Sequence, residues 1–190
     1  MSVTLVDLDR AAFAARAEEV LDVYAEAMEV PRSAASGRRS ILATHLERDG
    51  LAAVGALDEQ DTLLGIAYGY RGAPGQWWHD QVRAALDEAT ARTWLDGSFE
   101  VCEFHVRPSS QGTGLGRALL ARLLARTDAR TAVLTTPDLD TRARRFYATA
   151  GWVDLVRDLR FPGDPRSFAV LALSLEPARS LEPGPLASNG

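Results

Sequence analysis

Apolar side chains recur along the chain with two different periods, and these periods predict strands and helices in a mixed order. Helical spacing places Phe13, Val20, Leu21 and Tyr24 on one face of a helix over Ala11–Met28. The same reasoning predicts helices over Gly37–Arg48, Gln76–Leu95, Leu115–Arg126 and from Asp140 or Thr141 to about Ala150. Short apolar or alternating runs predict strands over Val3–Leu8, Leu51–Leu57, Thr62–Tyr70, Ser98–Val106, Ala132–Thr136, Trp152–Arg160 and Ser167–Leu175. This order favours an α/β chain with a mixed sheet covered by helices over a strict parallel βαβ array.

Composition narrows the class of protein further. The 190 residues are predicted to form one domain over residues 1–176, followed by a disordered tail over 177–190 that is rich in Pro, Ser, Gly and Ala. The formal net charge of -5 argues against nucleic acid as a partner. Cys102 is the only cysteine, and neither a signal peptide nor an apolar run that could span a membrane is evident. These features favour a cytoplasmic protein without a membrane partner.

A glycine-rich segment, Gln111-Gly112-Thr113-Gly114-Leu115-Gly116, lies between a predicted strand and a predicted helix. Such a turn exposes several backbone N–H groups at the positive end of a helix dipole, an arrangement that binds phosphates. A P-loop would need Lys and then Ser or Thr where Arg117-Ala118 stands, and the dinucleotide fingerprint would need glycine at position 117. The remaining pattern is Gln or Arg, two residues, Gly, one residue, then Gly or Ala. Gln111, Gly114 and Gly116 satisfy it.

With this pattern the sequence resembles the GNAT superfamily of acyl-CoA-dependent N-acetyltransferases. A second signature supports the resemblance, because Ala143, Phe146-Tyr147 and Gly151-Trp152 follow downstream in the family's order. The resemblance implies the GNAT fold, a central, mostly antiparallel mixed sheet of six to seven strands with helices on both faces. It also implies acetyl-CoA as co-substrate. The implied cofactor contacts are the backbone of Phe104, Val106, Gln111, Gly112, Thr113, Gly114, Leu115, Gly116 and Arg117.

Acetyl transfer to an amine needs a general base and a general acid. Glu100 and Glu103 are the candidate bases, since a carboxylate within a partly buried strand tends to have a raised pKa. Strict alternation would place Glu100 with Cys102 and Phe104 on one face, and Glu103 with Val101 and His105 on the other. The resemblance favours Glu100, which lies eleven residues before Gln111, and a salt-bridged or edge-exposed carboxylate is the alternative for both. His105 is an alternative proton relay or a structural histidine.

The acid implied by the resemblance is Tyr147, for which a core position is the alternative. One position departs from the family: Asp140 stands where many relatives carry Asn. A carboxylate there would repel a pyrophosphate unless it caps the helix or pairs with Arg144. His45, His79 and His105 lie far apart and lack ligand spacing with Cys102, so no metal site is predicted.

These observations predict an N-acetyltransferase that moves an acetyl group from acetyl-CoA to a primary amine of a small molecule by direct attack. Two alternatives stay open: a non-catalytic acyl-CoA-binding or sensing module, and a protein or peptide N-acetyltransferase. Trp77-Trp78 begins an additional helical segment that either walls an acceptor pocket, forms an oligomer contact or fills the core. A homodimer is compatible with such a family.

Overall fold

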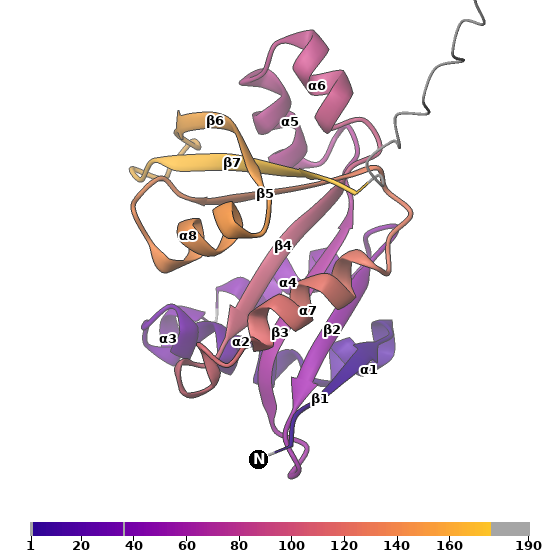
Figure 1. Ribbon diagram of the computed structural model, residues 1–190, viewed down its shortest axis with the longest axis vertical. Coiled ribbons are helices and arrows are strands. Elements are labelled where there is room, and N and C mark those ends of the chain that lie inside the picture. Colours follow the sequence, from indigo (N-terminus) through magenta and orange to yellow (C-terminus); the bar gives the residue numbers. More distant parts are fainter. Residues whose placement is uncertain (1, 36, 176–190) are drawn as a thin grey trace, which may run out of the picture.

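The computed structural model describes residues 2–35 and 37–175, which fold around a seven-stranded sheet in the order β1-β2-β3-β4-β5-β7-β6 (Figure 1). The strands are β1 (Thr4–Leu8), β2 (Ala52–Leu57), β3 (Leu63–Arg71), β4 (Phe99–Val106), β5 (Thr131–Pro137), β6 (Val153–Leu159) and β7 (Phe168–Ser174). Neighbouring strands are antiparallel except for β4 and β5, which run parallel. The predicted mixed, mostly antiparallel sheet is therefore confirmed. The predicted tail over residues 177–190 lies outside the described residues.

The helices fall close to the predicted segments, apart from a short one over Arg32–Ala35 that was not predicted. They are α1 (Arg10–Ala15), α2 (Ala17–Ala27), α3 (Arg32–Ala35), α4 (Arg38–Leu46), α5 (Trp77–Ala84), α6 (Glu88–Trp94), α7 (Leu115–Leu124) and α8 (Arg142–Thr149), with a short 3-10 turn, η1 (Pro108–Ser110). Of these described helices, none is long and apolar enough to cross a membrane.

Two segments that the periodicity predicts as single helices are each divided into two, so those predictions were wrong in detail. The helix over Ala11–Met28 breaks at Arg16, whose guanidinium reaches Asp61 in the turn between β2 and β3 at 2.6 Å. The helix over Gln76–Leu95 breaks before Asp87, whose carboxylate accepts from the Thr90 amide at 2.9 Å and caps α6. The first break depends on a distant contact, whereas the second follows from a local capping residue.

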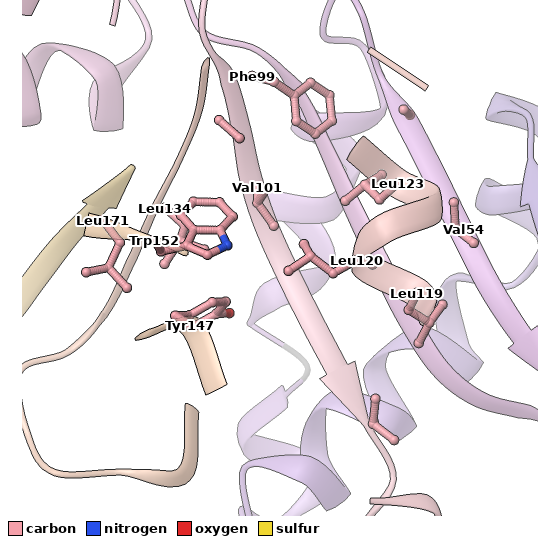
Figure 2. Packing of buried hydrophobic residues seen from close by; sticks show 14 of the residues in the cluster. Val54, Phe99, Val101, Leu119, Leu120, Leu123, Leu134, Tyr147, Trp152 and Leu171 are labelled. Atoms are coloured by element: carbon pink, nitrogen blue, oxygen red, sulfur yellow. The ribbon is translucent and has the colours of Figure 1, made fainter. Parts of the chain in front are cut away.

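Helices cover both faces of the sheet, as predicted. On one face α7 lies across β2, β3 and β4, and its buried leucines share a core with Tyr147 of α8 and with Trp152 (Figure 2). On the other face α2 packs against β3 and β4, with α4 beside it. The pair α5 and α6 covers the β5, β7 and β6 half through Val82, Ala91 and Leu95. The N-terminal and C-terminal halves of the sheet therefore meet at β4 and β5.

A β-bulge in β4 changes which side chains share a face. Tyr68 of β3 pairs with Glu103 and Gly69 pairs with Val101, so Cys102 is the extra residue of the bulge. The predicted alternation was wrong for this reason. Glu100 lies opposite Tyr70 and Glu103 opposite Tyr68, which places both carboxylates on the α2 and α4 face.

The side chains that remain on the other face of β4 are apolar. Val101 and Val106 belong to the core under α7, and Phe104 packs against that core. The bulge thus separates the strand into an acidic face and an apolar face, and both predicted carboxylates stay on the acidic one.

β4 and β5 diverge soon after they meet. Their pairing is confined to Phe99 with Ala132 and Glu100 with Val133, although β4 continues to Val106 and β5 to Pro137. The backbone edge of β4 from Val101 onward is therefore not paired with β5. The bulge and this unpaired edge occupy the same stretch of β4.

Candidate active site

The glycine-rich turn between β4 and α7 presents backbone amide groups at the end of the unpaired edge of β4. Gly112 and Gly114 adopt φ angles of 80° and 89°, a region that glycine enters without a steric penalty. Gly114 is the N-cap of α7, and among the described residues no side chain caps it. The amides of Leu115, Gly116 and Arg117 in the first helical turn therefore have no helical acceptor. This arrangement suits an anion.

Side chains brace the turn from both ends. The Gln111 side-chain amide donates to the carbonyl of Val106 at 2.9 Å and accepts from Arg142 of α8 at 2.8 Å. The Thr113 hydroxyl donates to the Ser110 carbonyl at 2.8 Å. Gln111 thereby connects the end of β4 to α8 across the opening between β4 and β5.

Gly116 lets the first turn of α7 lie against β4. A Cβ at this position would lie 3.3 Å from the ring of Phe104, a contact tighter than most that real Cβ atoms make. The predicted cofactor residues Phe104, Val106 and Gln111 to Arg117 follow the chain from the unpaired edge of β4 to the start of α7. The side chain of Arg117 is exposed beside it.

Glu100 is a buried carboxyl group in a largely uncharged setting. Its side chain is 5% exposed, and its Oε1 accepts from the Tyr70 hydroxyl at 3.4 Å and lies 3.7 Å from the Cys102 sulfur. Its Oε2 has no hydrogen-bond partner among the described residues. Burial raises the pKa of Glu100 to about 7, against the smaller opposing effects of Tyr70, Cys102 and Arg48. Such a group exchanges a proton near neutral pH.

The two neighbours of Glu100 keep their own protons. Burial raises the pKa of the Tyr70 hydroxyl and of the Cys102 thiol above their ordinary values. Both groups are therefore neutral donors to Glu100 at physiological pH. Neither was singled out by the sequence, although Gly69 within a strand is a signal for the bulge that brings Cys102 there. A Cβ at Gly69 would lie 2.1 Å from the Glu100 carbonyl oxygen.

Glu103 lies on the same face but in a charged setting. It forms an ion pair with Arg38 of α4 and accepts from the His105 ring at 2.5 Å. Burial and the nearby Arg38 lower the pKa of His105 to about 4, so the ring is neutral and donates its Nε2–H to Glu103. The Arg38 guanidinium also lies over the Tyr24 ring, 4.4 Å from its centre. Arg38 and Tyr24 were not predicted as site residues.

These groups form one side of a narrow pocket on the α2 and α4 face. It is lined by Val20, Leu21, Tyr24, Arg38, Ile41, Leu42, Tyr68, Glu103 and His105. Apart from the ion pair, the neutral histidine and two tyrosines, the lining is therefore aliphatic.

Tyr147 lies on the opposite face of the sheet from Glu100. It is 7% exposed, and its ring packs on Phe104 of β4 at 6.3 Å and on Trp152 at 5.6 Å between ring centres. Burial raises the pKa of its hydroxyl, which is therefore protonated at neutral pH. The two predicted acid–base residues therefore lie on opposite faces of the sheet, and the stretch of β4 without a β5 partner begins directly after Glu100.

Neither arrangement considered for Asp140, a cap of the helix or a pair with Arg144, occurs. Asp140 pairs with Arg145 at 2.5 Å, and Arg144 pairs with Asp154 of β6 at 2.6 Å. Thr141 caps α8 by accepting from the Arg144 amide at 3.1 Å. Thr141 is thus the cap of α8, and Asp154 is the partner of Arg144. Within the part of the chain that the structure describes, no group of His, Cys, Asp and Glu side chains could hold a metal ion.

Comparison with known proteins identifies the family of the chain. The model of a family described as the acetyltransferase (GNAT) family matches residues 17–152. The GCN5-like protein acetyltransferase Rv2170 of Mycobacterium tuberculosis is 37% identical over 204 residues, which cover 92% of this chain and 99% of that protein.

Solved structures resemble the fold at lower sequence identity. A GNAT-family protein from Desulfovibrio desulfuricans has a TM-score of 0.66 and 21% identity, over 91% of this chain and 99% of its own. A phosphinothricin acetyltransferase from Sinorhizobium meliloti, solved in complex with AcCoA, has a TM-score of 0.58 and 19% identity, over 92% of this chain and 89% of its own. At these identities the solved structures establish the shared fold.

Proposed function

Because the chain belongs to the GNAT acetyltransferase family, we propose that it transfers an acetyl group from acetyl-CoA to a primary amine by direct attack. Acetyl-CoA is the co-substrate, in line with the AcCoA complex of the structural relative from Sinorhizobium meliloti. The observation that carries the proposal is the position of Glu100, a buried carboxyl group with a pKa of about 7 where β4 and β5 part.

The cofactor is held along the unpaired edge of β4. Amides of the turn from Gln111 to Arg117 bind its pyrophosphate, because they point outward from the start of α7 without a capping side chain. Arg117 adds a charge-assisted contact to a phosphate. Backbone groups of Phe104 and Val106 bind the pantetheine arm and polarise the thioester carbonyl. Support for this path comes from its length without a β5 partner.

Glu100 and Tyr147 handle the protons from opposite faces. Glu100 takes a proton from the protonated acceptor amine, and the neutral nitrogen then attacks the thioester carbon. The nitrogen of the tetrahedral intermediate loses its second proton to solvent. The carbon–sulfur bond breaks as the tetrahedral intermediate collapses, and the Tyr147 hydroxyl gives its proton to the departing thiolate. Tyr147 then recovers a proton from solvent, and Glu100 releases to solvent the proton that it took. Support comes from the pKa of about 7 at Glu100 and the raised pKa of Tyr147.

Glu103 has a different role in this proposal. Its carboxylate already holds Arg38 and His105, so it is less free to accept a further proton than Glu100. Glu103 instead fixes Arg38 across the pocket on the α2 and α4 face, where the acceptor enters. This assignment leaves a single base at the reacting amine.

A protein lysine is a second candidate acceptor beside small-molecule amines. The relative at 37% identity is described as a protein acetyltransferase, which favours this reading. The lysine side chain ends in the same primary amine, so the chemistry at Glu100 is unchanged. Only the part of the acceptor outside the pocket differs between the two candidates.

The test is acetyl-CoA-dependent thiol release with a panel of small amines and lysine-containing peptides. Turnover on one of these classes is expected, with product mass raised by one acetyl group. Glu100→Gln is expected to lower kcat by about 10²–10⁴-fold, and Tyr147→Phe to lower it while leaving the affinity for CoA intact. Tight CoA binding without turnover on any amine or peptide would instead favour a sensing module, and the proposal would be overturned.

A further inference from the structure

Trp152 is held between the end of α8 and the start of β6. Gly151, with a φ of 87°, ends the helix, and the Trp152 amide donates to the Tyr147 carbonyl at 3.1 Å. Its side chain is 6% exposed in the core that also contains Val101, Leu134 and Leu171. The position of the indole is therefore set by the helix end and by packing on three strands.

The indole N–H of Trp152 is buried without a hydrogen-bond partner among the described residues. By contrast, the indole N–H of Trp78 donates to the Thr135 hydroxyl at 3.2 Å. Buried indole N–H groups usually have an acceptor, because an unpaired one has lost its hydrogen bond to water and gained none within the protein. A bound ligand that supplies an acceptor would satisfy the hydrogen-bonding capacity of the Trp152 indole N–H.

The direction of the N–H identifies where that acceptor lies. Figure 2 shows the indole nitrogen on the edge of the ring that faces Val101 of β4, away from Leu171. The Tyr147 hydroxyl lies at the β4 end of its own ring in the same view, and the two rings are 5.6 Å apart between centres. Val101 begins the stretch of β4 that has no β5 partner. Both polar atoms therefore point toward β4, beside the stretch of that strand that has no β5 partner.

We infer that the indole N–H of Trp152 donates a hydrogen bond to the pantetheine–thioester arm of bound acetyl-CoA, next to Tyr147. The inference rests on the proposed function, since it requires the arm to lie along this stretch of β4. An indole N–H does not release its proton in this pH range, so Trp152 binds and orients the arm while Tyr147 supplies the proton. Trp152 thus holds the arm, and Tyr147 protonates the departing thiolate.

The direct test observes the indole N–H groups by ¹⁵N–¹H correlation spectroscopy of the full chain. The four tryptophans give four indole signals, assigned by replacing each in turn with Phe. Addition of CoA is expected to move the Trp152 signal downfield. Adenosine 3′,5′-bisphosphate, which lacks the arm, is expected to leave it in place. The signal of Trp77, whose side chain is 57% exposed, serves as the internal control.

A second measurement uses affinity. Trp152→Phe keeps an aromatic ring but removes the donor, and it is expected to weaken CoA binding about tenfold, as for the loss of one hydrogen bond. The same variant should bind adenosine 3′,5′-bisphosphate as the parent does, and Trp77→Phe should bind both normally. The NMR experiment on the parent chain stands even if Trp152→Phe folds poorly, because the other three replacements assign the signal by elimination.

The outcomes separate this inference from the proposed function. If calorimetry detects CoA binding but the Trp152 signal does not move, the inference is wrong and the proposed function stands. An equal shift with the arm-free fragment also overturns it, since the contact would then not be with the arm. No affinity for CoA at all would overturn both.

Discussion

At the scale of single residues, Glu100 combines near-complete burial with one oxygen that has no partner among the described residues. The neighbouring donors Tyr70 and Cys102 favour its ionised form, and burial opposes them more strongly. The balance leaves the pKa at about 7, where a carboxylate is both available and basic enough to accept a proton. Glu103 lies three residues away on the same face, but it forms an ion pair with the guanidinium of Arg38.

This difference predicts the pH dependence of the reaction. Only ionised Glu100 can act as base, so kcat for acetyl transfer should rise with pH and level off above an apparent pKa near 7. Steady-state rates between pH 5.5 and 9 with a saturating acceptor amine would measure the curve. In Glu100→Gln the rising limb near 7 should vanish along with most of the rate. The same limb in that variant would show that another group titrates.

At the scale of secondary-structure elements, most of the sheet could be predicted from apolar periodicity. The strands differ from the predicted ranges by one residue or two, because the alternation of buried and exposed side chains is a local property. The division of the helix over Ala11–Met28 could not be predicted, since Arg16 is held by Asp61, a residue far away in sequence. The division before Asp87 could have been, because a capping aspartate is a local signal.

The candidate site was predictable only in part, for a related reason. The glycine turn, Glu100 and Tyr147 follow from motifs, but the face of Glu103 depends on the bulge at Cys102, which alternation does not contain. Arg38 and Tyr24 reach the site from helices that precede β4 by more than fifty residues. Such contacts arise from packing between α2, α4 and β4 and have no spacing signature in the sequence.

The turn before α7 supports a prediction at the element scale. Gly114→Ala places a side chain at a φ of 89°, which costs about 1–2 kcal/mol and disturbs the first-turn amides of α7. CoA binding measured by calorimetry should weaken by about tenfold or more. Gly75→Ala is the matched control, since Gly75 has a φ of 85° and neither added Cβ meets an atom within 4 Å.

Both variants should lose similar unfolding free energy in denaturant, because the strain at the two positions is alike. Only Gly114→Ala should lose affinity for CoA, because Gly75 precedes α5 on a different part of the fold. Equal affinities in the two variants would contradict a role for the turn in cofactor binding.

At the scale of the whole molecule, several buried groups make stability depend on pH in opposite directions. Burial lowers the pKa of His45 and of His105 to about 4, so these groups destabilise the fold as pH falls below about 6.5. Burial raises the pKa of Glu100 from 4.5 to about 7. The folded protein binds that proton more tightly than the unfolded chain, so its stability decreases as pH rises from about 4.5 through 7.

The last prediction follows from the loss of stability that accompanies ionisation of Glu100. At pH 8 the ionised Glu100 costs the fold about 3 kcal/mol relative to its protonated form, because burial raises its pKa from 4.5 to about 7. Glu100→Gln keeps the shape without the charge, so it should raise the unfolding free energy at pH 8 by up to that amount. At pH 5 the gain should shrink to about 1 kcal/mol or less. Denaturant unfolding at both pH values measures the difference.

Glu103→Gln is the control, because it alters a carboxylate of the same strand and the same face. Its removal leaves Arg38 without its partner carboxylate, so this variant should lose stability at pH 8 instead of gaining it. Opposite signs of the change in unfolding free energy would show that ionised Glu100 destabilises the fold, whereas Glu103 stabilises it. A destabilising residue of this kind is expected where the group is retained for its chemistry. A Glu100→Gln gain that is equal at pH 5 and pH 8 would contradict the raised pKa on which the proposed base depends.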